Sequence, residues 1–407
     1  MTSSHTRDAS PRRGQSTAAP TPATPGLLRS LNNRVVLDLF IQHTTLSRGD
    51  VGRLTGLSKP TASQLLVRLE ESGLVVDAGV GTPGPGGRAP QLYRLNPRAG
   101  YAAALNVTPA EIHVRIVDIV GAPVADLHLA DDVDTGEVGF RRAVAAIRSA
   151  AESTGIAPDE LSAVVVGAPG SYDPDADQLR YSDHLHDWQE PGLVAGFESL
   201  LACPVRIEND VNLVAVAEHR AASDDADNFF LLWLDERIGG AMVIDGRVYR
   251  GSHGAAGEAA FIQPSGVPVV RNPARVNRGG FEDLVGEEAI VRLAADHGIS
   301  AASASEAMAA AVATNGAEAT ALLTAIAERY AVGLASIHAL LDPRKIVVAG
   351  SLATLGGPAL RSAITAELST VALATPPVLG ATVTDDPVMS GALMSSLELA
   401  RDRVFST

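Results

Sequence analysis

The chain has 407 residues, of which 46 % are hydrophobic, which is enough for two or three domains with cores of their own. This composition excludes global disorder, and no apolar stretch approaches the roughly 20 residues that span a membrane. The single cysteine, Cys203, excludes a disulfide framework and a cysteine-rich zinc site. The first residues lack the apolar segment of a secretory signal, so we expect a globular protein of the cytoplasm without a membrane partner.

The net charge of −15 combines two regions of opposite sign. Residues 1–98 hold 12 Lys and Arg against 6 Asp and Glu, whereas the remainder holds 20 against 41. Such asymmetry is typical of a basic module that meets an anionic partner, joined to an acidic body that does not. A basic disordered tail fits the same numbers, so charge alone does not indicate DNA binding.

The first hundred residues begin with a tail and continue with helical patterns. Residues 1–26 are rich in Ser, Thr, Pro and Ala without periodicity, which predicts disorder. A helix follows, and its predicted buried face carries Leu31, Val35, Leu39 and Phe40.

Capping patterns predict two more helices. Ser47 and Asp50 form a capping-box-like start, and the short helix that they open ends near Leu54. Ser58 is a good N-cap for the next helix, and Gly73 is its expected stop. This spacing predicts a helix-turn-helix.

The last of these helices separates into an apolar and a polar face. Together with the preceding short helix, its apolar face predicts a small three-helix core made by Val51, Leu54, Leu57, Ala62, Leu65, Leu66 and Leu69. The other face carries side chains that reach base edges and phosphates in a major groove, namely Ser58, Lys59, Thr61, Ser63, Gln64 and Arg68. We interpret it as a DNA-recognition helix; a merely solvated helix face is the alternative.

A Gly- and Pro-rich loop separates two short apolar segments, 74–76 and 92–95. Residues 79–84 match the spacing of a dinucleotide-binding loop, but the segment leads into a strand and contains Pro83. We interpret the segments as the wing of a winged helix-turn-helix over residues 27–98, with Arg88 as a groove or phosphate contact. A plain linker is the alternative.

From residue 99 onwards short apolar runs alternate with helical stretches, which indicates an α/β fold. Three predicted strands followed by alternating helices and strands occur twice in succession. This order favours a two-lobed, actin-like or sugar-kinase (ribonuclease-H-like) fold. We expect lobe one at about residues 99–212 plus the C-terminal helix, and lobe two at about 213–386.

Four motifs make the interpretation specific. They are Gly167-Ala168-Pro169-Gly170, Glu208-Asn209-Asp210-Val211-Asn212, Gly251-Ser252-His253-Gly254-Ala255-Ala256-Gly257-Glu258 and Leu341-Asp342-Pro343. In order and spacing they resemble the ROK family (repressors, open reading frames and kinases). With the helix-turn-helix in front, the chain resembles the repressor branch across residues 27–407.

The resemblance implies a sugar site and names its residues. Asp210 lies at the position of the family's general base, and Asn209, Glu258 and Glu282 lie at positions that bind sugar hydroxyls. For Asn209 and Asp210 a helix cap is the alternative, because an apolar helix follows them. Phe261 replaces a family histidine that touches zinc and sugar; it either walls the effector pocket or fills the core.

Departures from the family pattern argue against kinase chemistry. Leu105-Asn106-Val107-Thr108-Pro109 replaces the first phosphate turn, and Asp235-Glu236-Arg237-Ile238-Gly239-Gly240-Ala241 replaces the second. We expect the carboxylates of Asp235 and Glu236 to face a γ-phosphate without a helpful partner. The family's zinc positions fall on Phe261, Pro273, Arg275 and Gly280, so no ligand set remains there.

We therefore expect a transcriptional regulator, with no catalysis, cofactor or metal, that binds a double-stranded DNA operator. A sugar or sugar derivative between the lobes modulates it, and a homodimer or homotetramer binds paired half-sites. Repression of carbohydrate-utilisation genes is the expected sense. In the alternative, the ROK-like domain is only a scaffold for dimerisation or a protein partner; a sugar kinase is disfavoured.

Overall fold

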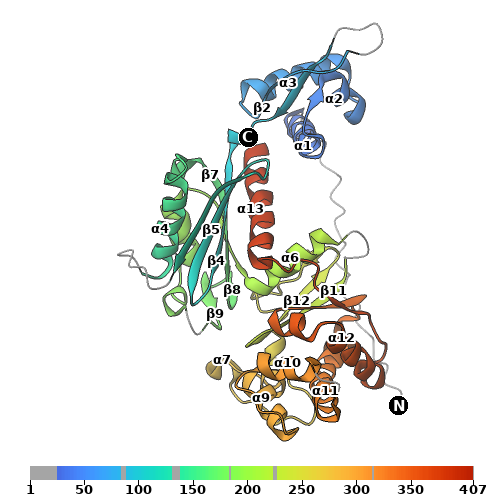
Figure 1. Ribbon diagram of the computed structural model, residues 1–407. Coiled ribbons are helices and arrows are strands. Elements are labelled where there is room, and N and C mark those ends of the chain that lie inside the picture. The colour runs from blue at the N-terminus through green and yellow to red at the C-terminus, as the bar shows by residue number, and fades with distance from the viewer. Residues whose placement is uncertain are drawn as a thin grey trace, which may run out of the picture. The chain divides into compact units, whose positions relative to one another are not determined.

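The computed structural model describes residues 25–83, 89–130, 138–182, 185–222, 227–313 and 316–406. Within them the chain forms two compact units, the first ending at Leu95 and the second spanning Asn96–Phe405 (Figure 1).

The first unit is a winged helix-turn-helix. Its elements are α1 (Pro25–His43), β1 (Leu46–Ser47), α2 (Arg48–Thr55), α3 (Lys59–Glu71), β2 (Val75–Val80) and β3 (Gln91–Leu95). The strands form an antiparallel sheet in the order β1-β3-β2, so β2 and β3 are the two sides of the predicted wing. Arg88, at the end of the wing loop, lies outside the described residues.

The capping patterns form as predicted. The Ser47 side chain accepts a hydrogen bond from the Asp50 backbone, and the Asp50 carboxylate accepts one from the Ser47 backbone. At α3 the Ser58 side chain accepts from the backbone N–H of Thr61. Gly73 follows α3 with φ = +74°, a left-handed conformation that glycine adopts without strain.

The buried face of α1 differs from the prediction. Val36, Leu37 and Phe40 are buried, whereas Leu31 and Val35 are about half exposed. The prediction followed the 3–4 spacing that starts at Leu31, and the face that actually packs is rotated from it by one residue. The helix carries apolar residues on several sides, so its sequence does not define a single buried face. Leu54 was also predicted in the core but is 38 % exposed.

The second unit begins with a five-stranded sheet in the order β10-β7-β4-β5-β6. Its strands are β4 (Tyr101–Val107), β5 (Glu111–Asp118), β6 (Pro123–Ala130), β7 (Leu161–Ala168) and β10 (Val205–Asn209). The helices α4 (Gly139–Glu152) and α5 (Leu193–Leu201) cover one face. Between β7 and α5 lies a small hairpin, β8 (Ser171–Asp173) and β9 (Gln178–Arg180), that was not predicted.

A second five-stranded sheet has the order β13-β12-β11-β14-β15. Its strands are β11 (Phe229–Leu234), β12 (Ile238–Ile244), β13 (Arg247–Val248), β14 (Lys345–Ala349) and β15 (Val378–Gly380). In both sheets the first strand pairs antiparallel with the second and parallel with the fourth. The repeated topology confirms the predicted α/β, two-lobed sugar-kinase-like fold.

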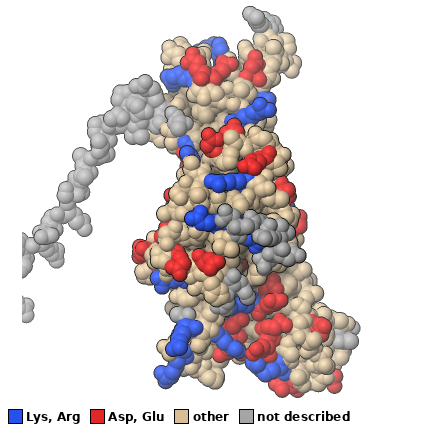
Figure 2. All heavy atoms as spheres, turned by 90° about the vertical axis from the view of Figure 1, so that its left-hand side faces the viewer, with Lys and Arg blue, Asp and Glu red and all other residues tan. Residues whose placement is uncertain are grey.

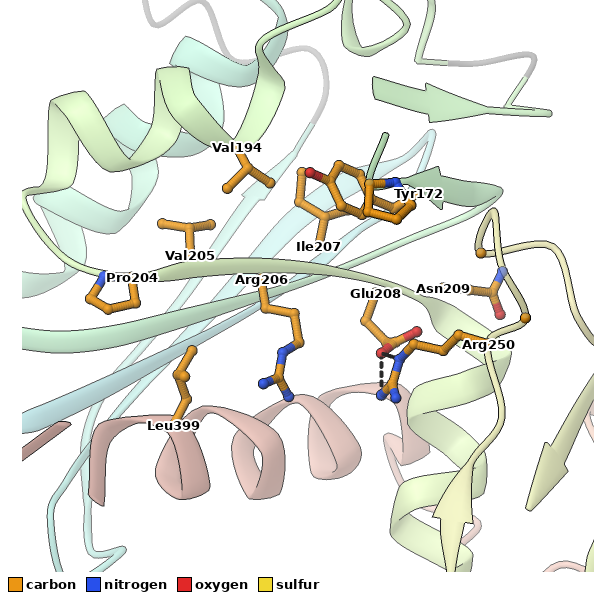
Figure 3. Close-up of a pocket in the computed structure, with 13 residues that line it drawn as sticks. Tyr172, Val194, Pro204, Val205, Arg206, Ile207, Glu208, Asn209, Arg250 and Leu399 are labelled. Atoms are coloured by element: carbon orange, nitrogen blue, oxygen red, sulfur yellow. Dashed lines mark hydrogen bonds and ion pairs between the residues drawn. The ribbon is translucent and has the colours of Figure 1, made fainter. Parts of the chain in front are cut away.

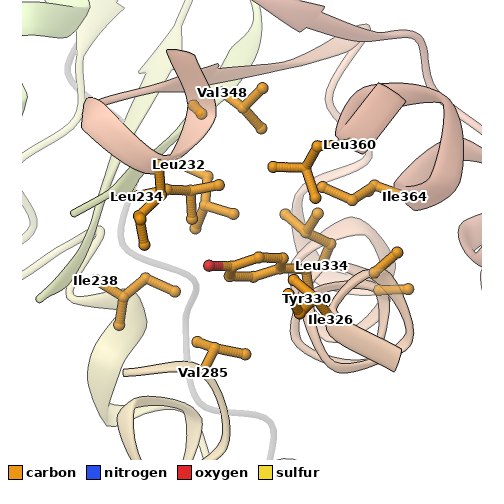
Figure 4. Packing of buried hydrophobic residues seen from close by; sticks show 14 of the residues in the cluster. Leu232, Leu234, Ile238, Val285, Ile326, Tyr330, Leu334, Val348, Leu360 and Ile364 are labelled. Carbon is orange, nitrogen blue, oxygen red and sulfur yellow. The ribbon is translucent and has the colours of Figure 1, made fainter. Parts of the chain in front are cut away.

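Helices fill the remainder of the second lobe. They are α7 (Pro273–Val276), α8 (Gly280–Val285), α9 (Glu287–Asp296), α10 (Ala304–Ala313), α11 (Ala317–Leu341) and α12 (Ser351–Val371). By length and composition alone α11 could cross a membrane, which the sequence analysis did not anticipate. Its Tyr330 and Leu334 instead lie in the core among side chains of β11, β12 and β14 (Figure 4), and core helices of globular domains meet the same criterion.

Two helices lie between the sheets. One side of α6 (Asp210–Ala221) packs Val211, Val214 and Ala215 against the second sheet. Its Leu213 packs with residues of the first sheet and of α13 (Pro387–Phe405). The helix α6 therefore touches both lobes, and its N-terminus lies where they face one another.

Cys203, just after α5, is 4 % exposed. Burial raises the pKa of its thiol from an ordinary 9.0 to about 11. The thiolate, which is the reactive form, is therefore scarce at neutral pH.

Candidate functional site

The helix α3 presents the polar face that the sequence predicted. Ala62, Leu65, Leu66 and Leu69 are buried. On the other side Lys59, Gln64 and Arg68 are exposed, and Ser63 is partly buried. The face therefore offers two cations and an amide that no core packing constrains.

Ser58 and Thr61 are engaged with each other at the start of α3. Their hydroxyl oxygens lie 2.8 Å apart, and the Ser58 oxygen also caps the helix. Both side chains are exposed, so either can still hydrogen-bond to a phosphate oxygen. Their DNA contact remains a prediction, as it does for Arg88.

A cavity of about 360 Å³ lies between the two lobes of the second unit. Its walls come from the end of β7, the β10–α6 junction, the β11–β12 turn and the segment 258–261. Four of the five predicted effector residues line it, namely Asn209, Asp210, Glu258 and Phe261, together with Pro109, Pro169, Gly170, Tyr181, Ser182, Val211, Trp233, Asp235, Glu236, Arg237, Ile238, Gly239, Ala260 and Asn277.

Two carboxyl groups dominate the electrostatics of this cavity. Burial raises the pKa of Asp210, and together with the nearby negative charge of Glu258 it brings the pKa from 3.8 to about 6, although the backbone N–H of Val211 opposes the rise. Burial also raises the pKa of Glu258, although a hydrogen bond from the Ser171 hydroxyl and the charge of Arg237 oppose the rise. The cavity therefore holds carboxyl groups whose charge is costly unless a ligand donates to them.

Asn209 is the N-cap of α6. Its side-chain oxygen accepts from the backbone N–H of Asn212 at 3.0 Å, and its amide nitrogen donates to the Gly170 carbonyl at 3.0 Å. The cap that the sequence offered as an alternative is thus present. An amide retains one further donor and one further acceptor site, so sugar contact by Asn209 stays a prediction.

Phe261 both packs and lines the cavity. It is partly buried against the core of the second lobe, and its ring centroid lies 5.5 Å from that of Tyr181. Both rings line the cavity, so one wall is aromatic. Aromatic surface of this kind suits the apolar C–H face of a sugar ring.

Glu282, the fifth predicted effector residue, does not line this cavity. Its carboxylate accepts a hydrogen bond from the backbone N–H of Ile238 at 3.1 Å. It lines an adjacent hollow of about 220 Å³, which shares Glu236, Arg237 and Asn277 with the first. A role in sugar binding by Glu282 therefore stays a prediction.

The turn that replaces the second phosphate loop is occupied by its own carboxylates. Asp235 accepts from the backbone N–H of Glu236 at 3.1 Å and from the Ser351 hydroxyl at 2.8 Å, and Glu282 takes the N–H of Ile238. The expectation that these carboxylates have no partner was wrong for Asp235. Two backbone donors of the turn, the N–H groups of Glu236 and Ile238, are nevertheless already bonded to carboxylates.

Sequence reasoning missed two polar residues of the cavity. The hydroxyl oxygen of Ser182 and the amide oxygen of Asn277 are buried and have no hydrogen-bond partner within the described residues. A buried polar atom left unpaired costs about 1–3 kcal/mol. Neither residue belongs to a recognisable motif, so only the structure brings them to the cavity.

A larger cavity of about 520 Å³ lies along β10 (Figure 3). Val205, Arg206 and Glu208 line it, and Arg250 closes on Glu208 through two contacts of 2.6 Å. It shares Asn209 with the interlobe cavity. This cavity was not predicted, because β10 is an edge strand and its free side is known only once the order of the strands is known.

Comparison with known proteins bears on both units. The chain matches the family model of the ROK family over residues 128–398 and that of the IclR helix-turn-helix domain over residues 35–78. A crystal structure of a ROK family transcriptional regulator, described as a homolog of the E. coli MLC protein, superposes with a TM-score of 0.70 at 18 % identity over 93 % of this chain and 97 % of its own. A ROK hexokinase from Thermus thermophilus superposes with a TM-score of 0.60 at 23 % identity over 74 % of this chain and 99 % of its own.

Curated relatives are similar over part of their length. The xylose repressor of Bacillus subtilis is 25 % identical over 57 % of this chain and 60 % of its own. The transcriptional dual regulator NagC of Escherichia coli is 26 % identical over 58 % of each chain. The matches thus span less than two thirds of these relatives. The ROK match covers more than half of the sequence, the fold agrees with it, and the chain belongs to the ROK family.

Proposed function

We propose that this protein is a DNA-binding transcriptional repressor of the cytoplasm whose DNA affinity is set by a sugar or sugar derivative. The observation that carries the proposal is the pair of buried oxygens in the interlobe cavity, on Ser182 and Asn277, that have no partner among the described residues, in a chain whose first unit matches an IclR-type helix-turn-helix. The printed names of the relatives, a xylose repressor and NagC, agree with this function.

The interlobe cavity suits a polyhydroxylated ligand. Sugar hydroxyls donate to carboxylates and accept from amides, and the cavity supplies Asp210, Glu258, Ser182 and Asn277. A bound sugar also satisfies the unpaired oxygens, which removes their cost only in the liganded state. That difference is the free energy that a ligand needs to shift a conformational equilibrium.

The first unit supports the DNA-binding half of the proposal. The exposed side chains of Lys59, Gln64 and Arg68 extend from α3 at positions that suit a major groove. Helix-turn-helix proteins bind paired half-sites as dimers, so we propose a homodimer or homotetramer on a pseudo-palindromic operator.

We also propose that the protein transfers no phosphoryl group. The N–H groups of Glu236 and Ile238 are bonded to carboxylates, and two acidic side chains, Asp235 and Glu236, line the cavity where a phosphate would lie. Like charge in a partly buried site repels a nucleotide phosphate. An ATPase assay in the presence of sugars is expected to show no turnover above the buffer rate.

One experiment tests the effector site. Purified full-length protein is screened by thermal shift against mono- and disaccharides, sugar phosphates and ATP. We expect one class of sugar to raise Tm in the wild type and not in Glu258→Ala, while Glu398→Ala, an exposed residue that lines neither hollow, serves as a control. A folded, DNA-binding protein that responds to no sugar contradicts the proposal and supports the alternative of a ligand-free scaffold.

A further inference from the structure

The β5–β6 hairpin of the first lobe carries a cluster of histidines and carboxylates that do not line the interlobe cavity. His113 on β5 pairs directly with His128 on β6, and their rings stack with centroids 3.8 Å apart. Both imidazole Nε2 atoms approach the same oxygen of Asp126, at 2.7 Å and 3.7 Å. The three candidate ligand atoms lie within 4.8 Å of one another.

Each histidine has a second carboxylate at its other ring nitrogen. His128 Nδ1 lies 3.1 Å from Glu111, and His113 Nδ1 lies 3.4 Å from Asp386. When an ion takes the Nε2 side of the ring, a carboxylate at Nδ1 holds the ring proton there, and the Nε2 lone pair faces the ion. Metal-binding histidines are oriented in this way, with the outer carboxylate setting both the tautomer and the ring orientation.

The net charge of the cluster also favours a bound cation. Three carboxylates, Glu111, Asp126 and Asp386, surround the two imidazoles, and Arg115 is the cation that pairs with two of them. With neutral imidazoles these six side chains carry two net negative charges. One divalent cation balances that charge, and it replaces the proton that His113 must otherwise donate to Asp126.

We propose that His113, Asp126 and His128 bind one divalent metal ion of the zinc class. Two imidazole nitrogens and one carboxylate oxygen are a common Zn²⁺ ligand set, with water completing the tetrahedron. His113 is buried and fixed, whereas the His128 side chain is 57 % exposed and free to tilt toward the ion. The site is separate from the family's zinc positions at Phe261, Pro273, Arg275 and Gly280.

The location of Asp386 gives the site a structural role. Asp386 directly precedes α13, the helix that packs on β4 and β7 and against α6. An ion that orders His113 also orders its Asp386 partner. The metal thereby ties the start of α13 to the β5–β6 hairpin.

The test uses untagged full-length protein, freed of metal by a chelator and titrated with Zn²⁺ against a chromophoric competitor. We expect one Zn²⁺ per chain, a rise in Tm on Zn²⁺ addition, and visible d–d absorption when Co²⁺ replaces it. His128→Gln should lower the affinity by about 100-fold or more, and Glu111→Gln by about tenfold, as outer carboxylates usually do.

A matched control comes from the other cluster that could hold a metal in the described part of the chain, Asp173, Asp175 and His253. That cluster contains a single histidine, and the His253 and Asp175 side chains are 71 % and 78 % exposed, so His253→Gln should leave Zn²⁺ binding unchanged. Equal binding by wild type and His128→Gln overturns the proposal, as does wild-type binding weaker than millimolar. If circular dichroism finds His128→Gln misfolded, Asp126→Asn and the wild-type Co²⁺ spectrum decide.

Discussion

Asp210 illustrates how one residue of the cavity carries an energetic cost in the free protein. Its carboxyl group binds protons more tightly when folded, with a pKa of about 6 against 3.8. The folded state therefore holds more protons between these values. The raised pKa adds up to about 3 kcal/mol to the free energy of unfolding. This contribution is fully present below pH 3.8 and is lost as the pH rises through 6.

Asp210→Asn should therefore raise Tm at pH 8 and have little effect at pH 4. The amide keeps the shape of the side chain and removes the buried charge. Thermal melts of both proteins from pH 4 to pH 8 measure the difference, which should grow through pH 6. A constant difference across that range contradicts a buried, charge-dependent cost at Asp210.

The unpaired hydroxyl of Ser182 makes a second prediction at the residue scale. Ser182→Ala removes a buried oxygen without a partner, so Tm of the free protein should stay the same or rise. The Tm shift produced by the effector sugar should become smaller, because one ligand contact is lost. A large loss of stability in the free protein would show that the hydroxyl has a partner.

At the scale of elements, we propose that α3 determines the DNA sequence preference, whereas α11 packs the core of the second lobe. Gln64→Ala should relax base preference at one position and cost about 1–3 kcal/mol of binding. Arg68→Ala should weaken binding to all sequences and reduce the salt dependence if it contacts phosphate. Fluorescence anisotropy with operator and scrambled duplexes at several salt concentrations separates the two, with exposed Glu71→Ala as the control.

Gly333 shows why α11 sits so close to α8. A Cβ added at Gly333 would lie 2.2 Å from the fully buried ring of Phe281. Gly333→Ala should therefore destabilise the protein by about 1–3 kcal/mol, although alanine is the better helix former. Chemical denaturation measures this cost, and Gly49→Ala, whose added Cβ meets ordinary contact only, should be neutral or stabilising.

Features that depend on neighbouring residues in the sequence could be predicted, whereas features that depend on packing between distant segments could not. Helix caps depend only on residues within one turn of the cap. Those at Ser47 with Asp50, at Ser58 and at Gly73 formed where they were predicted. The register of α1 and the exposure of Leu54 depend on what packs opposite, which the sequence alone does not show. The β8–β9 hairpin was missed because its three-residue strands are too short for a period-two pattern.

The sequence motifs predicted most, but not all, of the polar residues that line the interlobe cavity. Asn209, Asp210, Glu258 and Phe261 meet in one cavity, but Ser182 and Asn277 belong to no motif. Their unpaired oxygens become visible only when burial and partners are known. The His113 cluster needs two strands and the residue before α13 to meet, so the expectation of no metal was drawn from the family's zinc positions alone.

For the whole molecule, the charge division of the sequence remains the dominant feature. Acidic and basic side chains of the described residues are interspersed on the face in Figure 2. Residues beyond 98 hold 41 Asp and Glu against 20 Lys and Arg, so the larger unit repels DNA at long range. Operator affinity should fall steeply with added salt, because the basic residues near α3 supply the attraction.

The helix α6 joins the lobes through one further contact. The buried carboxylate of Glu218 accepts from the backbone N–H of Val383 at 2.6 Å and of Thr382 at 2.9 Å, in the connection from β15 to α13. Glu218→Ala leaves two N–H groups without a partner and should cost about 2–4 kcal/mol. Denaturation curves measure the loss, and exposed Glu398→Ala on α13 should cost less than about 0.5 kcal/mol.

The buried thiol of Cys203 makes the protein convenient for fluorescence spectroscopy. A thiol reagent should label none of the native chain at neutral pH and one site after denaturation. Two cysteines introduced on the surface of opposite lobes can therefore carry a dye pair while the native cysteine stays in place. The distance between the dyes, followed in single molecules as sugar is added, then reports directly whether the lobes close.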